Sequence, residues 1–520
     1  MVKYEKKKYI FLLLAFLAAA FILRINNLSS RSLWADEFFT LFQSTGHGEV
    51  QKYLDTLSDF YPPKYFNPDF FKQMLHNDSA KTINDVTVGL IREDTHPPLY
   101  FWLMYFWMRL FGDGIFPVRF LSVLMGLFSV FLAYRVTRIL FGGDAALFSA
   151  LFISICPFAV VYSREARHYA FITALALASW LFVLRFERKK RNIDLLWATI
   201  LNSLAMLTHY FYFFTFLGQL IYFTLIYRKD KDTLDKFYLS FFCSFLLLAP
   251  WFSLVMANGY NFFLASWPFG YFGFAGKVYY LLIAVSRYIF VFEPVGIIMR
   301  LLLLAGLFGL ILWIRPILKN ALSQYRRESL FCFIMFLVPL LIISVIDIIQ
   351  HGVLLKQERF LTFPFIGLIP LAGYCFYYLF RKNKKIFIFC CLFLFIYSVV
   401  ISANPQFGPA SLGAAEWINR ESKGYRTAVI MGNIRSVILT QAYYMNDDIC
   451  IVPVTNGEQL REGVNVLSNS VDKIFIVRHF NRTDPELVDP GFIRIKEIGS
   501  GFKLTQSIEK DYIGVFEFTK

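Results

Sequence analysis

The sequence predicts a mainly α-helical polytopic membrane protein that ends in a small extracytoplasmic α/β domain. Three observations lead to this fold class. Hydrophobic residues make up 57% of the 520 residues, and the mean hydropathy is +0.52, whereas soluble proteins are usually about 45–50% apolar. Long apolar runs alternate with short Lys and Arg clusters, as the positive-inside rule requires of a chain that crosses a membrane repeatedly. After residue 404 the apolar runs shorten to the length of strands.

Charge and cysteine content exclude two functional classes. The formal net charge of +15 would suggest nucleic-acid binding in a soluble protein. Here the excess Lys and Arg lie between apolar runs, so the charge reports membrane topology instead. The seven cysteines are scattered and form no spaced pair or Cys/His cluster, so neither a disulfide framework nor a zinc site is indicated.

The first apolar run covers residues 9–23 and follows Lys3 and a lysine run at 6–8. A signal peptide would have the same composition. No clear small-residue cleavage site follows, however, and many further apolar runs come later in the chain. We therefore interpret the run as a retained first span with a cytoplasmic N-terminus.

A first external loop is predicted over residues 24–116, because this segment is polar and mixed. Its aromatic part at 100–111 is only about 12 residues long, too short to cross roughly 30 Å of hydrocarbon. We expect an interfacial or re-entrant helix there.

Basic clusters fix the direction of the remaining spans, which bring the total to about eleven. These spans are 117–138, 145–163, one ending at Arg185, one ending at His209, 210–227, 237–256, 295–313, 330–349, 360–380 and 386–400. A second external loop is expected at 257–294. An odd number of spans places the C-terminal domain outside the cell membrane.

Residues 404–520 have the alternating pattern of a small α/β domain, and we divide the chain into a membrane domain at 1–403 and this domain. Strands are predicted at 427–431, 449–454, 474–477, 492–498 and 512–519, and helices at 411–421, 433–443 and 458–467. The domain shows no glycine-rich phosphate loop and no nucleophile elbow. Acceptor binding and simple packing both remain open for it.

Two adjacent acids, Asp36 and Glu37, follow the first span. An ionised acid at the edge of a bilayer is costly unless it is solvated, paired or used, so the pair is a candidate active site. The alternative is that both are ordinary polar residues of a solvated loop.

Residues 163–169, Ser-Arg-Glu-Ala-Arg-His-Tyr, fall at an outer span junction. If this segment is helical, Arg164 and Arg167 share one face and Glu165 and Tyr169 share another. One face would take a phosphate and the other an acceptor hydroxyl. The alternative is an interfacial charge cluster with internal Arg–Glu pairing.

Further candidate phosphate ligands are His96, Lys356 and Arg359, each at the predicted outer end of a helix. Helix N-termini favour anions, and Arg suits bidentate phosphate contact. A helix-capping role for His96 and a lipid-headgroup anchor formed by Lys356 and Arg359 are the alternatives. We interpret His209 as structural.

These motifs together resemble the GT-C glycosyltransferases. The motifs are Trp34-Ala-Asp-Glu-Phe, Thr95-His-Pro-Pro-Leu-Tyr, Ser163-Arg-Glu-Ala-Arg-His-Tyr and Glu358-Arg-Phe, and the resemblance covers roughly residues 8–400. It is closest to the branch containing dolichyl-phosphate-mannose–protein mannosyltransferase-like enzymes and the aminoarabinose transferases of lipid A.

The resemblance implies inverting transfer of one sugar from a polyprenyl-phosphate donor to an acceptor at the outer face of the plasma (inner) membrane. The acceptor would be a glycolipid, a protein or a glycan. Asp36 would be the general base that activates the acceptor, with Glu37 assisting, and Glu165 would be a second active-site acid.

The resemblance also implies a site for the lipid phosphate. Arg164, Arg167 and Arg359 would stabilise the charge that develops on the leaving phosphate. His96 occupies the place where some relatives have a Lys near this group, so its role is an open question.

Three alternatives remain open. A divalent cation held by Asp36, Glu37 and Glu165 would suit hard oxygen ligands, although the sequence has no dedicated metal signature. A lipid-linked sugar transporter, or flippase, would make no bond, but it is expected to place charges inside its spans and often to show internal repeats. An oligosaccharide-polymerising or ligating enzyme would use the same lipid-carrier chemistry.

Overall fold

The computed structural model describes most of the chain. The residues outside the description are 1, 51–63, 93–95, 259–272, 292–314, 350–353, 404–410, 433–440, 455–456, 480–501 and 511–512. The chain forms two compact units. We call residues 1–28, 95–100 and 118–404 the membrane unit, and residues 29–94, 101–117 and 405–520 the sheet unit.

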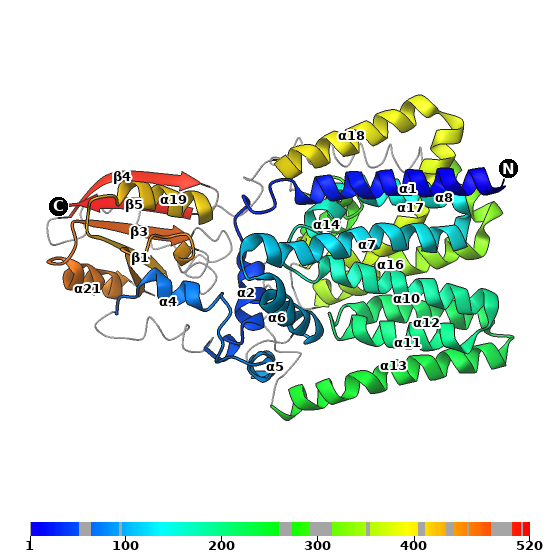
Figure 1. Ribbon diagram of the computed structural model, residues 1–520, viewed down its shortest axis with the longest axis horizontal. Helices are drawn as coiled ribbons and strands as arrows, with labels where there is room; N and C mark the ends of the chain where they lie inside the picture. Colours follow the sequence, from blue (N-terminus) through cyan, green and yellow to red (C-terminus); the bar gives the residue numbers. More distant parts are fainter. Residues whose placement is uncertain are drawn as a thin grey trace. The chain divides into compact units, whose positions relative to one another are not determined.

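The membrane unit is a bundle of helices (Figure 1). Its principal described helices are α1 (Val2–Ile25), α7 (Ile115–Phe141), α8 (Gly143–Ile155), α9 (Pro157–Tyr162), α10 (Tyr169–Lys189), α11 (Asn192–Met206), α12 (Tyr212–Tyr227), α13 (Lys231–Ala257), α14 (Phe274–Ile283), α16 (Arg326–Ile349), α17 (Thr362–Lys382) and α18 (Lys384–Ala403). Within the described residues, seven helices are long and apolar enough to cross a membrane, and α8 and α12 are shorter apolar helices. The prediction of a mainly helical polytopic membrane protein is confirmed. The predicted span at 295–313 lies outside the described residues.

The span predicted at 145–163 is not one continuous helix. It is broken between α8 and α9 at Cys156–Pro157, where Pro157 opens the second helix. A proline has no N–H and disfavours helical conformation in the residue before it, so the break falls where sterics require. Arg24, which is fully buried, donates to the carbonyls of Ile153 and Ser154 at 3.0 and 3.1 Å and thereby satisfies the end of α8.

Two glycines let α17 approach its neighbours closely. A Cβ atom on Gly367 would meet the backbone nitrogen of Phe336 on α16 at 2.5 Å, and one on Gly373 would meet the Cβ of Ser149 on α8 at 2.5 Å. Small residues at such crossings allow the backbone-to-backbone packing that stabilises membrane helix pairs. Helix α17 is therefore fixed between α8 and α16.

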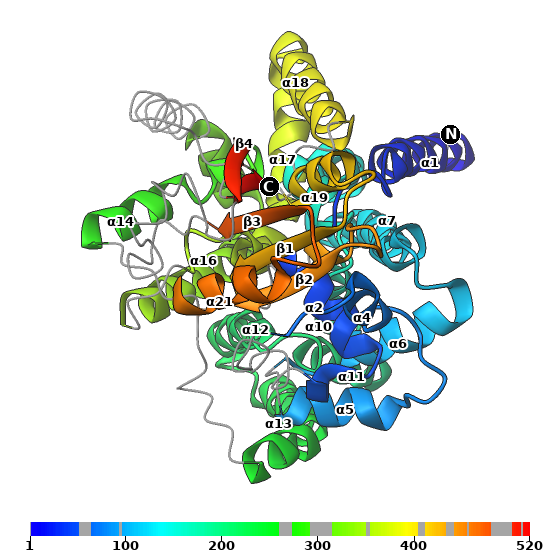
Figure 2. The same ribbon diagram turned by 90° about the vertical axis from the view of Figure 1, so that its left-hand side faces the viewer.

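The sheet unit contains a five-stranded mixed sheet of order β2-β1-β3-β5-β4. The strands are β1 (Thr427–Gly432), β2 (Cys450–Val454), β3 (Lys473–His479), β4 (Lys503–Lys510) and β5 (Ile513–Thr519). β1 lies between β2 and β3 (Figure 2) and pairs with both in parallel. β5 is antiparallel to β3 and β4. Helices α19 (Ser411–Glu421) and α21 (Gly457–Leu467) are those predicted, and β4 was not predicted. The predicted strand at 492–498 and most of the predicted helix at 433–443 lie outside the described residues.

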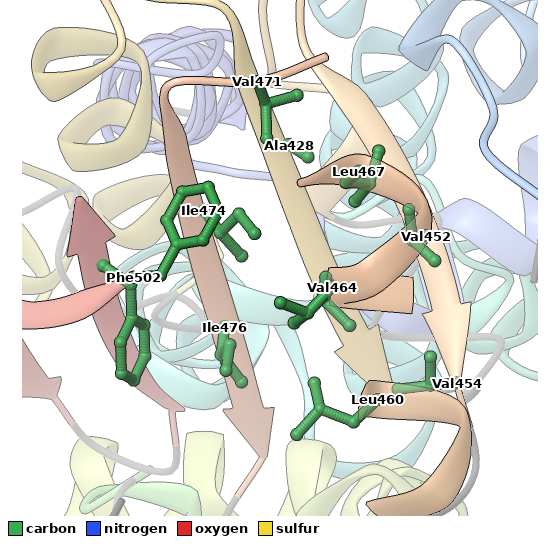
Figure 3. Packing of buried hydrophobic residues seen from close by; sticks show 12 residues of the cluster. Ala428, Val452, Val454, Leu460, Val464, Leu467, Val471, Ile474, Ile476 and Phe502 are labelled. Atoms are coloured by element: carbon green, nitrogen blue, oxygen red, sulfur yellow. The ribbon is translucent and has the colours of Figure 1, made fainter. Parts of the chain in front are cut away.

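One face of the sheet carries an apolar core built from α21 and the parallel strands (Figure 3). Val452, Leu460, Val464 and Ile474 meet there, and all four are at most 3% exposed. The alternation of strands with an amphipathic helix produced the α/β prediction for this segment. The predicted small C-terminal α/β fold is thereby confirmed.

Most of the first external loop, residues 29–94 and 101–117, belongs to the sheet unit. It contributes α2 (Ala35–Ser44), α4 (Pro68–Gln73) and α5 (Ile83–Arg92). Phe66 forms an antiparallel bridge with Ile451 of β2 through two backbone hydrogen bonds of 2.8 Å. Lys72 forms an ion pair with Asp447 at 2.5 Å. The loop thus extends the sheet at its β2 edge. The short helix predicted at 100–111 is α6 (Leu99–Phe111).

Candidate functional site

The connection between α9 and α10 is a buried polar loop. Every residue from Ser163 to Tyr169 is at most 4% exposed, although the segment includes two arginines, a glutamate and a histidine. Residues 163–168 form turns and bends rather than a helix. The prediction that Arg164 and Arg167 share one helical face depended on this segment being helical, so it does not apply here. The role of each side chain follows from its own contacts.

Arg164 is used in joining helix ends. Its guanidinium donates to the carbonyl of Asn26, just after α1, and to the carbonyl of Ser402 in α18 at 3.1 Å. Buried cations are tolerated when backbone carbonyls satisfy their N–H groups. This geometry favours a structural role for Arg164 over the predicted phosphate contact.

Arg167 and Tyr169 lie at the start of α10. The guanidinium carbon of Arg167 is 5.8 Å from the centre of the Tyr169 ring, and Arg167 is 4% exposed. Ser122 of α7 donates to the carbonyl of Arg167 at 3.2 Å. Ser122 thereby holds the backbone of Arg167, and the ring of Tyr169 lies beside its guanidinium group.

Glu165 lies in a buried group of charges that also includes Glu358 and Arg287. Its carboxylate and that of Glu358 both lie within electrostatic range of Tyr162, as does the guanidinium of Arg287. Glu165 is 4% exposed. The predicted second acid is therefore inside the membrane unit and close to charged partners.

Three histidines meet beside Arg167. The ring centres of His168 and His209 are 4.6 Å apart, and those of His96 lie 6.0 Å from His168 and 6.2 Å from His209. Arg167 and Arg359 both lie within electrostatic range of His168 and His209. We call these five residues the Arg–His cluster. It brings together three of the predicted phosphate ligands and adds two residues to them.

His209 is positioned by the turn between α11 and α12. Tyr212, the first residue of α12, donates to the side-chain oxygen of Asn202 of α11 at 2.7 Å, and Ser179 of α10 donates to the same oxygen at 2.6 Å. These buried bonds tie three helices together next to the turn. The structural interpretation of His209 missed its place in the cluster. One signal was available: three of only seven histidines fall at predicted outer ends of helices.

The segment before α17 is fixed by Arg287, another residue that the sequence did not mark as functional. Arg287 is in the short helix η3 (Ser286–Tyr288) and is 3% exposed. It donates to the carbonyls of Leu355 and Lys356 at 2.7 and 2.6 Å and forms an ion pair with Glu358. These bonds hold the chain on either side of the predicted ligands Lys356 and Arg359, both of which are partly exposed.

We expect Arg287→Met to lower the thermal stability of the protein in detergent. The change leaves the carboxylate of Glu358 without its cation and removes two backbone contacts. The loss should fall below the roughly 3–5 kcal/mol of a fully buried pair, because the side chain of Glu358 is 23% exposed. The double variant Arg287→Met/Glu358→Gln should recover part of the loss. Equal instability of both variants would assign the effect to the backbone carbonyls alone.

The acid pair opens helix α2 of the sheet unit. Glu37 is fully buried and accepts the backbone N–H of Trp34 at 3.2 Å, which caps the helix. Asp36 is partly exposed in the first turn. An acidic side chain in the first turn of a helix lies beside the partly positive backbone N–H groups. The two adjacent acids thus have different environments.

A pocket of about 600 Å³ is present in the sheet unit, at the amino ends of the parallel strands. Tyr65 and Tyr425 line it, together with Asp448 and the ion pair between Arg426 and Asp472. Within the described ranges, no group of three or more His, Cys, Asp or Glu side chains is arranged to hold a metal ion. All seven cysteines are free.

Comparison with solved structures identifies the fold. ArnT from Cupriavidus metallidurans in its apo state superimposes with a TM-score of 0.57 at 16% identity, over 97% of both chains. The chain has the GT-C glycosyltransferase fold. A second structure of the same ArnT is described as bound to undecaprenyl phosphate. In sequence, residues 95–254 match the family model described as dolichyl-phosphate-mannose-protein mannosyltransferase.

Two curated proteins match part of this chain. An uncharacterized protein of Aquifex aeolicus is 31% identical over 194 residues, which are 37% of this chain and 38% of that protein. YycA of Bacillus subtilis, whose name marks it as a candidate mannosyltransferase, is 31% identical over 109 residues, 21% of this chain and 16% of that protein. The matched regions thus span well under half of either relative.

Proposed function

We propose that this protein transfers a sugar from a polyprenyl-phosphate donor to a glycolipid, protein or glycan, with inversion at the anomeric carbon. The observation that carries the proposal is the Arg–His cluster, in which Arg167 is buried beside three imidazoles in a helical membrane unit. Such cationic and N–H-rich groups bind phosphate. Two findings support this choice of ligand: the GT-C fold, and the undecaprenyl phosphate bound to the similar ArnT.

In the proposed reaction, the acceptor hydroxyl attacks the anomeric carbon and the bond to the phosphate oxygen breaks, with its electron pair remaining on the phosphate. Arg167 and Arg359 stabilise that charge, and His96 and Lys356 contribute to the same site. Fixed cations in a site shielded from water act strongly because they need no reorganisation during the reaction.

Asp36 takes the proton of the acceptor hydroxyl. Its place in the first turn of α2, partly exposed, suits a carboxylate that must remain ionised and accessible. Glu37 positions this turn through its bond to Trp34. Glu165 acts as the second acid, and Tyr169 orients Arg167. Arg164 holds the loop that carries Glu165 and Arg167. A divalent cation on the acids remains open to test with a chelator.

We also propose the orientation that the basic clusters predict. The N-terminus is cytoplasmic, and the sheet unit faces the outside of the plasma (inner) membrane, where polyprenyl-linked sugars meet their acceptors.

The test uses purified protein in liposomes with radiolabelled polyprenyl-phosphate monosaccharides and membrane acceptors. We expect label to move to the acceptor as free polyprenyl phosphate is released, in equal amounts. Movement of intact labelled lipid across the bilayer with no release would contradict the proposal and identify a transporter. If the protein bound no lipid phosphate at all, that result would contradict both the transferase and the transporter.

A further inference from the structure

His168 and His209 come from two different helix connections and face each other inside the membrane unit. His168 is fully buried, and among the described residues neither of its ring nitrogens has a hydrogen-bond partner. A buried imidazole without partners is costly, and such groups call for an explanation such as a ligand. His209 is 8% exposed, at a ring-centre distance of 4.6 Å.

The backbone fixes the tautomer of His209. Its Nδ1 accepts the N–H of Phe211 at 3.0 Å. A neutral imidazole that accepts at Nδ1 carries its proton on Nε2. His209 therefore presents an N–H donor on the ring atom opposite the backbone bond.

Charged and titratable groups face the pair from every side. Arg167 and Tyr169 adjoin His168 in sequence. His96 comes from the segment just before α6, Tyr100 from the first turn of α6, and Arg359 from the segment before α17. Burial, followed by the neighbouring histidine and arginine charges, lowers the pKa of His168 well below its usual value. Burial, then His96, Arg167 and Arg359, does the same for the pKa of His209. Both rings are therefore neutral at pH 7 when no anion is present.

We propose that His168 and His209 bind the lipid phosphate directly and that the pair takes up a proton when this phosphate monoester binds. The inference rests on the proposed function, and it concerns the product of transfer. The donor is a phosphodiester with one negative charge, whereas the product is a monoester with a second ionisation near pH 6.

The electrostatic reason is the balance of charge in the cluster. Without a ligand, the two arginines oppose a further positive charge on the rings. A bound dianion offsets the arginine charges and makes the imidazolium form favourable. By linkage, a group whose pKa rises on binding makes the complex tighter as the pH falls through the interval between its free and bound values, by up to about tenfold per pH unit.

The experiment measures binding of undecaprenyl phosphate to the full-length protein in detergent by calorimetry. Titrations at pH 8 and pH 6.5, each in two buffers of different ionisation enthalpy, give the affinity and the number of protons exchanged. The variants are His168→Gln and His209→Asn, in which Asn keeps an acceptor for the N–H of Phe211. His76→Gln is the control, because His76 belongs to the sheet unit and contacts Asp113 at 3.3 Å.

We expect the wild-type protein and His76→Gln to take up protons on binding and to gain about three- to tenfold more affinity than His168→Gln on going from pH 8 to pH 6.5. His168→Gln should lose most of the uptake, because the Nδ1 of His209 accepts the N–H of Phe211 and His168 is the ring left to take the proton. Titration of the lipid itself is common to all variants and cancels in the comparison.

Proton release or zero exchange in the wild-type protein would overturn the inference while leaving the phosphate site in place. This measurement needs no variant to fold. Unchanged uptake in both histidine variants would also overturn it. Absence of binding at either pH would overturn the proposed function, and the inference with it.

Discussion

Asp36→Asn should reduce sugar transfer by about 10²–10⁴-fold while the protein still binds polyprenyl phosphate, because the change removes only the base. Asparagine keeps the size of the side chain and its place in the first turn of α2, so the helix should persist. The measurement is the initial rate of label transfer in liposomes, with undecaprenyl phosphate binding measured on the same preparation.

Asp69→Asn is the matched control for this change. Asp69 is also an acid in the first turn of a helix of the sheet unit, and it is exposed. The Asp69→Asn variant should transfer sugar at the wild-type rate. Wild-type transfer by Asp36→Asn would show that Asp36 is not the base and would leave Glu165 as the acid to test.

Arg167→Gln should weaken binding of polyprenyl phosphate by about 10–100-fold, the equivalent of one charge-assisted hydrogen bond of roughly 1.5–3 kcal/mol. Transfer should fall by more than this factor, because the charge on the phosphate grows as the sugar leaves. Arg167→Lys should recover part of the binding, since it restores the charge without the bidentate geometry. This recovery separates a phosphate contact from a folding defect.

Arg135→Gln is the control for this second change. Arg135 is a partly exposed cation of α7, and its contact is with the ring of Phe131 at 5.5 Å. The Arg135→Gln variant should bind lipid phosphate as tightly as the wild-type protein does. Equal losses in both variants would assign the effect to overall charge rather than to the Arg–His cluster.

The membrane fold could be predicted because its signal is local. An apolar run must satisfy its own backbone in a helix, so length and hydropathy identify each span without knowledge of its neighbours. The broken span at Cys156–Pro157 marks the limit of this reasoning. Composition identified an apolar segment, but the proline and the buried Arg24 determine its path.

The candidate site was predicted only in part, because its residues come from segments that are distant in the sequence and meet only in the folded chain. His168 and His209 lie in two different helix connections, and nothing in either local sequence reports that their ring centres are 4.6 Å apart. Arg164 and Arg167 have the same charge and lie three residues apart, yet one bonds to backbone carbonyls and the other lies in the cluster. The missed strand β4 reads Lys-Leu-Thr-Gln-Ser-Ile-Glu-Lys, too polar to be marked as a strand by its apolar pattern.

The bonds from Arg24 to the end of α8 bear on the order in which the protein is made. The chain enters the membrane from its N-terminus, so α1 precedes α8 by more than a hundred residues of synthesis. The guanidinium is therefore already at the bilayer when the carbonyls of Ile153 and Ser154 arrive and lose their water. Each of those carbonyls would cost several kcal/mol if it remained unsatisfied in lipid. Helix α1, which is made before α8, thus supplies the hydrogen-bond donors that the interrupted later helix needs.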